Sequence, residues 1–409
     1  MERMAGKTAH SWALIGGLSA WAALQPVVGC NGTTTQDTGN PVDDSPIVVQ
    51  LLGSVGPDIV VPTLERFAVE ASALSASLEA LEAANQAGED TAGLRAEAQT
   101  QWVETMRVWA ELDVMQIGPQ GSSLSAISGE DIRDEVYSWP TTVNPCRVDQ
   151  VTADESYSED SFFSSNLVNA YGLDALEHLL FADQDTPCPS QVPPVSDGAW
   201  DALGESGIAL NRSSYALALS NHIEDQAADL IETWSADGGN FSGHLARTTD
   251  DTPYGSDQEA LNAVFDALFF LEKTTKDVKL AKPLGKLDCE DDICPEDVEG
   301  VLSGSALVSI ESNILGFSAL FHGGDGVGLD DLLVDVGHGD LAEQISSDLD
   351  EALESLAGIE GSLEQAIVDD YAQVETFYEE LRDVTSALKG DLATVLALQI
   401  PSEAAGDND

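Results

Sequence analysis

The chain has 409 residues, of which 43% are hydrophobic, and this is enough for two or more globular domains with buried cores. Its 16 Lys and Arg residues stand against 73 Asp and Glu residues, giving a formal net charge of −57. Phosphate contacts require clustered basic side chains, so this charge argues against nucleic acid as a partner. An acidic surface attracts cations in general and does not by itself indicate a specific metal site.

The N-terminus has the pattern of a processed export signal. Arg3 and Lys7 provide a positive start, residues 11–28 are mostly apolar, and Val27-Val28-Gly29-Cys30 ends the stretch. This resembles a bacterial lipoprotein signal, which implies removal of residues 1–29 and a lipid on Cys30. The protein would then be attached to a membrane of the cell envelope, on the periplasmic side of the outer membrane or at the cell surface. A plain secretory signal with an incidental cysteine is the alternative.

The segment after Cys30 offers almost nothing to bury. Residues 31–44 are Gly, Thr, Asn, Asp and similar polar types, which predicts a flexible tether over residues 30–47. At the other end, residues 401–409 are predicted to form an acidic tail.

The cysteine count fits an oxidising compartment. If Cys30 carries a lipid, four cysteines remain, which predicts two disulfides. We prefer Cys289 with Cys294, closing a short acidic loop, and Cys146 with Cys188. A zinc site built from the four thiols is the competing interpretation, and it is disfavoured because no close C-x-x-C pair is present.

Apolar residues recur at steps of three and four in most of the remaining chain, whereas alternating strand patterns are scarce. The predicted elements are, in order, a helix beginning near Pro62, a helix from about Thr91 through Trp109 that Gly118-Pro119 stops, helices around residues 223–234 and 261–271, and two antiparallel helices with stripes at 341–356 and 363–388. This pattern predicts an all-α protein of two packed helical bundles. The proline-rich stretch 183–198 is the predicted joint, which places the first bundle at 48–190 and the second at 191–400.

One helix carries the candidate chemistry. In residues 172–181, Asp174, Glu177 and His178 fall within one third of the helix circumference, and four leucines fill the opposite side. Carboxylates and an imidazole at this spacing can face one metal ion. A solvated helix face gives the same pattern, so the residues alone leave the choice open.

The order and spacing of several segments resemble the imelysin family, a group of bacterial envelope proteins built from two helical bundles. The segments are Trp102, Arg107 and Trp109 with Gly118-Pro119, then Tyr137-Ser138-Trp139-Pro140, the stretch 172–177, and residues 282–285, 313–317, 326–333 and 388–391 with Leu396. The likeness covers most of the chain after the tether. No single segment is specific to the family, but the order and spacing of the segments together are.

One departure from the family pattern concerns the motif itself. Where the family has G-x-H-x-x-E, this chain keeps Gly172 and Glu177 but has Asp174 in place of the histidine. A hydrolytic zinc site needs about three protein ligands and a water molecule, so this substitution weakens a peptidase interpretation. Two carboxylates instead favour Ca²⁺, Mn²⁺ or ferric iron. His178 could supply a nitrogen ligand or could be a surface histidine.

The resemblance therefore implies a lipid-anchored envelope protein that binds a metal, iron or an iron-bearing ligand, between two bundles and acts in uptake with an envelope transport partner. Iron, manganese, calcium and zinc all stay open as the bound ion. Asp174, Glu177 and His178 are the expected ligands, with Gly172 and Arg107 supporting the cleft. Arg107 is expected to be buried, and either a structural ion pair or an orienting contact to Glu177 would account for it. The alternatives are a zinc metallopeptidase and a non-catalytic, partner-binding lipoprotein with a decayed motif.

Overall fold

The computed structural model describes residues 45–141, 143–401 and 404, and these belong to one compact unit. The predicted signal segment, Cys30 and nearly all of the acidic tail lie outside the described residues. Most of the predicted tether also lies outside the described residues. The prediction is wrong for residues 46 and 47, because helix α1 already begins at Pro46.

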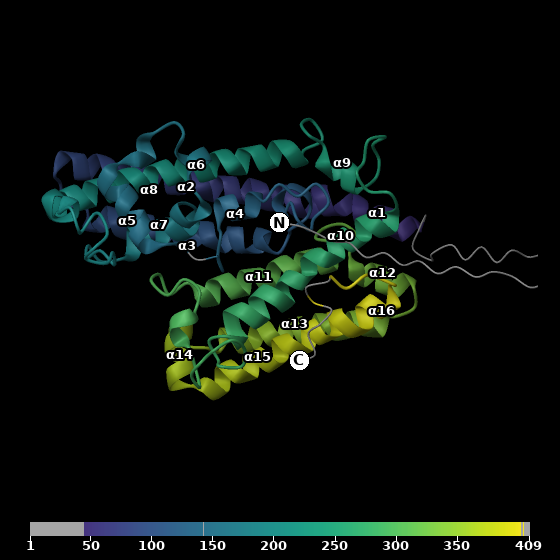
Figure 1. The fold of residues 1–409 in the computed structure, drawn as a ribbon. Coiled ribbons are helices and arrows are strands. Elements are labelled where there is room, and N and C mark those ends of the chain that lie inside the picture. The colour runs from purple at the N-terminus through teal and green to yellow at the C-terminus, as the bar shows by residue number, and fades with distance from the viewer. Residues whose placement is uncertain (1–44, 142, 402–403, 405–409) are drawn as a thin grey trace, which may run out of the picture. The chain divides into compact units, whose positions relative to one another are not determined.

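The described part of the chain consists of helices and connecting loops and contains no β-strand, which confirms the all-α prediction. Two sets of helices are seen in Figure 1. The first comprises α1 (Pro46–Ser54), η1 (Val55–Val60), α2 (Val61–Ala87), α3 (Ala92–Asp113), η2 (Gly118–Gln120), α4 (Ile132–Val136), α5 (Pro145–Asp154), η3 (Ser156–Ser158), α6 (Phe162–Ser165), η4 (Val168–Ala170), α7 (Leu173–Phe181), α8 (Ala199–Trp234) and α9 (Phe241–Leu245).

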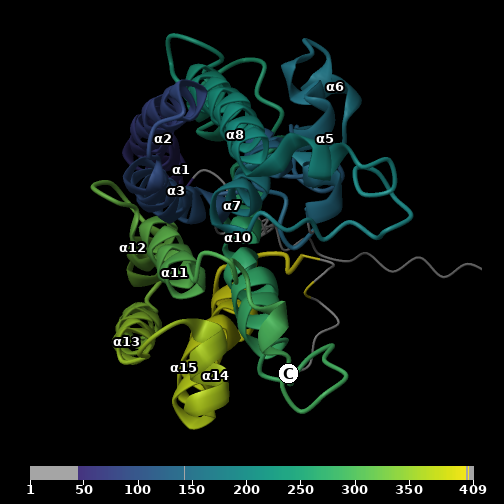
Figure 2. The same cartoon turned by 90° about the vertical axis from the view of Figure 1, so that its left-hand side faces the viewer.

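The second set follows in the chain and packs against the first mainly through α11 on α3. It comprises α10 (Asp257–Phe270), η5 (Leu271–Ala281), η6 (Pro295–Asp297), α11 (Ala306–His322), α12 (Leu329–Asp335), α13 (Gly339–Ala357), α14 (Leu363–Asp369), α15 (Tyr371–Ala387), η7 (Leu388–Leu392) and α16 (Ala393–Val395). Seen from the end in Figure 2, α7 lies close to the boundary between the two sets.

The first long helix does not start at Pro62 as predicted. It runs from Pro46 to Ala87 through η1, a π-helical segment directly before Pro62. Proline lacks the N–H of a regular helical hydrogen bond, and a π-turn is one way in which a helix passes such a position. Among the described residues this stretch is the one long and apolar enough to cross a membrane, with a mean hydropathy of 1.6 in its most apolar window. That window is 56% buried within the protein, as expected of a core helix.

The predicted boundary between bundles at residue 190 is too early. Helix α8 lies along α2 and also packs on α5 and α7, so it belongs to the first set. The apolar residues that mark its later part, such as Ile223, Leu230 and Trp234, are fully buried there. The proline-rich stretch 183–198 is thus a connection within the first set, and the second set begins with α10.

The C-terminal helices follow their apolar stripes. Ile345 and Leu349 of α13 and Val374 and Phe377 of α15 are buried where these helices pack together. The predicted last helix is divided, because Asp370 has an extended φ of −142° and separates α14 from α15.

Both predicted disulfides are confirmed. Cys146 of α5 is bonded to Cys188 in the proline-rich connection, and Cys289 is bonded to Cys294 in the loop between η5 and α11. The first bond ties the proline-rich connection to α5, and the second closes a short loop within one segment.

Candidate functional site

Helix α7 is surrounded by α3, α5 and α8, so its polar side chains meet protein on several sides. Its first turn is set by Gly172, which has a φ of +100°. A Cβ atom at this position would lie 2.8 Å from Asp174 Oδ1 and 3.0 Å from the Val136 carbonyl oxygen. Glycine is therefore required for the chain to approach this closely and to turn into the helix. Gly172 thus shapes the start of the helix that carries Asp174, while its support of a cleft stays a prediction.

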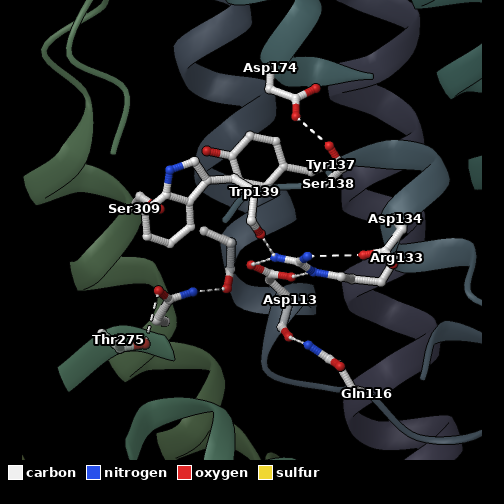
Figure 3. A network of polar contacts seen from close by, with 12 residues as sticks. Asp113, Gln116, Arg133, Asp134, Tyr137, Ser138, Trp139, Asp174, Thr275 and Ser309 are labelled. Atoms are coloured by element: carbon white, nitrogen blue, oxygen red, sulfur yellow. Dashed lines mark hydrogen bonds and ion pairs between the residues drawn. The ribbon is translucent and has the colours of Figure 1, made fainter. Parts of the chain in front are cut away.

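Asp174 points from α7 toward the segment that follows α4. Its Oδ2 accepts a hydrogen bond of 2.8 Å from the Ser138 hydroxyl (Figure 3). Its Oδ1 accepts one of 3.0 Å from the Ala175 backbone N–H. Burial raises the pKa of Asp174 to about 7, although these hydrogen bonds and the positive charge of Arg133 oppose the shift. Asp174 is therefore a carboxyl group that exchanges its proton near neutral pH.

Glu177, one helical turn further on, reaches across to the second set of helices. Its Oε1 accepts a hydrogen bond of 2.8 Å from the Ser303 backbone N–H, in the loop before α11. Burial raises its pKa, and the negative charge of Glu299 raises it further, whereas the hydrogen bonds from Ser303 lower it. Asp174 thus meets the segment after α4 and Glu177 meets the loop before α11, a choice between protein and solvent that the spacing on α7 left open.

A chain of buried polar groups crosses the same junction. The Tyr137 hydroxyl donates to Glu299 Oε1 at 2.8 Å, and Glu299 Oε2 is 2.8 Å from Lys279 Nζ. These three residues are at most 3% exposed. The pKa of Tyr137 is raised well above its usual value by burial and then by the charges of Glu299, Glu177 and Asp174. Tyr137 therefore lies within electrostatic reach of all three carboxylates.

A second ion pair borders this chain. Arg133 Nε donates to Asp113 Oδ1 at 2.7 Å, and the same guanidinium donates to the Trp139 carbonyl oxygen (Figure 3). Burial raises the pKa of Asp113 even though Arg133 and Lys279 act to lower it. The carboxyl groups of Asp113, Asp174, Glu177 and Glu299 thus lie near the two cationic groups of Arg133 and Lys279, and Arg133 also pairs with Asp134 at 3.1 Å.

His178 does not join this group. It is 5% exposed, and its Nε2 lies 3.1 Å from Asp149 Oδ1 of α5, which is also 3.2 Å from Arg212 of α8. About 100° of helix rotation separates it from Glu177, and this rotation turns the imidazole toward α5 and α8. The expected ligand role for His178 does not fit this position, and neither does the surface alternative.

Arg107 is also placed differently from the prediction. Its side chain is 39% exposed rather than buried, and it pairs with Glu104 of its own helix at 3.3 Å and with Glu311 of α11 at 3.4 Å. The interpretation as a structural ion pair is the one that agrees with these contacts. Glu177 instead takes its hydrogen bond from Ser303.

Three residues of the junction were not predicted from the sequence. Tyr137 belongs to a segment whose sequence signal is its family resemblance, and Glu299 lies in a loop without a distinctive pattern. Lys279 offers one usable signal, because it is among only 16 basic residues in the chain.

The chemistry available at the junction is that of oxygen donors. Carboxylate and phenol oxygens suit hard cations such as Mn²⁺, Ca²⁺ and iron. Within the described residues, no three His, Cys, Asp or Glu side chains converge closely enough to hold a metal ion as they stand. Any cation held here would have to draw these carboxylates closer together and compete with the proton of Asp174.

Fold and site together define an all-α protein with two sets of helices and a carboxyl-rich junction between them. The profile of the Imelysin family matches residues 60–388, and the chain belongs to that family.

Two solved structures share the fold. One is an imelysin-like protein from Psychrobacter arcticum 273-4, with a TM-score of 0.65, 17% identity and coverage of 88% of this chain and 98% of that one. The other is called "putative iron-regulated protein A precursor" and comes from Parabacteroides distasonis ATCC 8503, with a TM-score of 0.63, 15% identity and coverage of 88% and 97%. No curated protein matches the chain.

Proposed function

We propose that this protein binds a hard metal cation, iron among them, at the junction of its two helical bundles, and that it does so as a lipid-anchored protein of the cell envelope taking part in uptake. The observation that carries the proposal is the inward orientation of Asp174 and Glu177. Two carboxyl groups one turn apart share a buried junction in which acidic groups outnumber basic ones.

The electrostatics of the junction support cation binding. Burying carboxylates without matching positive charge is unfavourable, and here that cost appears as raised pKa values of Asp174 and Glu177. A bound cation would supply the missing positive charge and replace the proton of Asp174. The name of the Parabacteroides distasonis protein mentions iron regulation, which agrees with a role in iron handling.

Attachment to the envelope is proposed from the N-terminal sequence. The apolar segment that ends in Gly29-Cys30 resembles a lipoprotein signal, and two disulfides suit an oxidising compartment. The polar residues after Cys30 would then separate the helical part from the membrane.

The zinc peptidase alternative receives less support. It needs a third ligand near Glu177, and the imidazole closest in sequence, that of His178, is paired with Asp149. We therefore favour binding over hydrolysis.

The proposal is tested by titrating the purified mature chain with Mn²⁺ and following heat release by calorimetry. Replacing both Asp174 and Glu177 by Ala should weaken the tightest binding step by about tenfold or more, since both carboxylates are lost as ligands. The matched control is Glu351→Ala with Glu354→Ala, an exposed pair at the same spacing on α13. Equal titration curves for all three proteins would mean that Mn²⁺ binds only to the acidic surface.

A further inference from the structure

A groove with a volume of about 1100 Å³ runs along helix α10. Three segments form its walls: residues 116–127 after α3, residues 255–274 from the start of α10 into η5, and residues 399–404 at the end of the described chain. Sites for small molecules usually measure roughly 300–1,000 Å³. The groove is therefore large enough for a segment of a polymer.

The side of α10 that borders the groove carries a row of polar side chains. Gln258, Asn262 and Asp266 recur at steps of four residues, so they lie one above the other on the helix. Four residues of an α-helix rise about 6 Å, and every second residue of an extended peptide lies about 6.6 Å further along. An extended peptide laid along α10 would therefore bring an equivalent backbone group close to each side chain of the row.

Asn262 already holds an extended stretch of this chain. The Gln399 backbone N–H donates to Asn262 Oδ1 at 3.2 Å, and Gln258 Nε2 donates to the same oxygen at 3.4 Å. Gln399 lies in a stretch without helical structure that forms one wall of the groove. An amide side chain offers both a donor and an acceptor, which suits a peptide backbone because the backbone presents both as well. The contact with Gln399 indicates that the row can bind main-chain groups.

The ionisable side chains of the groove favour a cationic ligand over an anionic one. Glu259 and Asp266 are exposed carboxylates on its wall. Lys273 also lines the groove, but its ammonium group lies 3.7 Å from Asp277 and is partly offset by that carboxylate. The net charge of −57 over the whole chain acts in the same direction.

Leu124 supplies an apolar contact at the rim. It belongs to the loop that borders the groove, and it is 96% exposed. Single exposed leucines are common on protein surfaces and need no partner. A ligand lying in this groove would nevertheless cover Leu124 and remove apolar surface from water, which favours binding.

We propose that the groove along α10 binds an extended peptide segment of a partner protein, and that this segment carries Lys or Arg side chains. The inference goes beyond metal binding at the junction and does not depend on it, so each can fail without the other. The chain's own end is a less suitable occupant, because residues 402–409 contain three acidic residues and no Lys or Arg.

The test exposes the purified mature chain to random dodecapeptides displayed on phage, at about 0.15 M salt. The enriched peptides are synthesised, and their Kd values are measured by fluorescence anisotropy. We expect these peptides to be rich in Lys and Arg. Leu124→Ser should weaken their binding by about fivefold through lost apolar contact, and Asp266→Lys by about tenfold through charge reversal.

Two exposed positions outside the groove provide matched controls. Val69→Ser on α2, where the valine is 65% exposed, removes an apolar side chain, and Glu351→Lys on α13 makes the same change in net charge as Asp266→Lys. Both controls should leave Kd unchanged within about twofold. The four substituted residues are exposed, so each variant is expected to fold, and circular dichroism checks this.

A chain that ends at Ala404 distinguishes a partner's peptide from the chain's own end. It should bind the selected peptides as the natural chain does. A gain in affinity of more than about tenfold would mean that residues 405–409 fill the groove, and this would overturn the inference. Failure to enrich any peptide, or equal losses in the groove variants and the controls, would overturn it as well.

Discussion

At the residue scale, burial of the Asp174 carboxyl group opposes its ionisation and so links the stability of the protein to pH. Its pKa is raised to about 7 by burial, from an ordinary value of 3.8. Between these two values the unfolded chain has lost this proton while the folded chain still holds it. The contribution of Asp174 to stability therefore decreases as pH rises from about 4 to about 7 and stays unfavourable above that.

Asp174→Asn should remove this penalty, because the amide carries no charge and can still accept the Ser138 hydrogen bond. We expect the variant to be more stable than the natural chain at pH 8 by about 2 kcal/mol, a value reduced from the full shift because the side chain keeps some solvent contact. The difference should shrink toward zero as pH is lowered to 4. Urea unfolding at a series of pH values measures this difference in the free energy of unfolding. A difference that does not change with pH would contradict the raised pKa of Asp174.

Which side chains meet at the junction could be predicted only in part. The leucines of the same helix predict which face packs, but periodicity alone did not decide whether Asp174 and Glu177 on the other face meet protein or solvent. His178 lies on the predicted stripe but meets Asp149, which is 29 residues away in the chain. Tyr137, Glu299 and Lys279 come from three separate segments, and no local pattern brings them together.

At the scale of elements, helix α7 depends on the conformation of its first residue. Gly172 has a φ that is unfavourable for other residues, and a Cβ atom added here would lie against the Val136 carbonyl and the Asp174 side chain. A side chain here would disturb both the helix start and the carboxylate that the helix presents.

Gly172→Ala should lower stability by about 1–3 kcal/mol, from backbone strain together with the steric clash. The control is Gly198→Ala at the start of α8, where φ is +75° but nothing lies within 4 Å of the added Cβ. Gly198→Ala introduces backbone strain without a steric clash, so it should lower stability by less than Gly172→Ala does. Thermal melting compares the two, and only Gly172→Ala should also weaken Mn²⁺ binding. Equal losses in both variants would show that the close approach to Asp174 does not matter.

The helices themselves were largely predictable, whereas their grouping was not. Apolar stripes locate α2, α3, α13 and α15 because each helix buries one face. The assignment of α8 to the first set depends on packing against α2, more than a hundred residues earlier in the chain. A proline-rich stretch marks a break in helix but does not reveal whether the chain then leaves the bundle.

At the scale of the whole molecule, the net charge of −57 sets the background against which any specific site must be measured. Exposed carboxylates attract cations weakly, and salt screens this attraction over about 10 Å. The junction differs because Asp113 and Glu299 are buried and Asp174 and Glu177 are only partly exposed, so their charges are screened less. Binding at the junction should therefore persist at high salt, while binding to the surface is lost.

The most direct measurement is an anomalous difference map from crystals of the mature chain soaked with Mn²⁺ at high salt. We predict one strong peak at the junction, within about 2.0–2.6 Å of carboxylate oxygens of both Asp174 and Glu177. Peaks confined to exposed acidic helices, with none between the two sets of helices, would contradict the proposal that this protein binds a metal cation there.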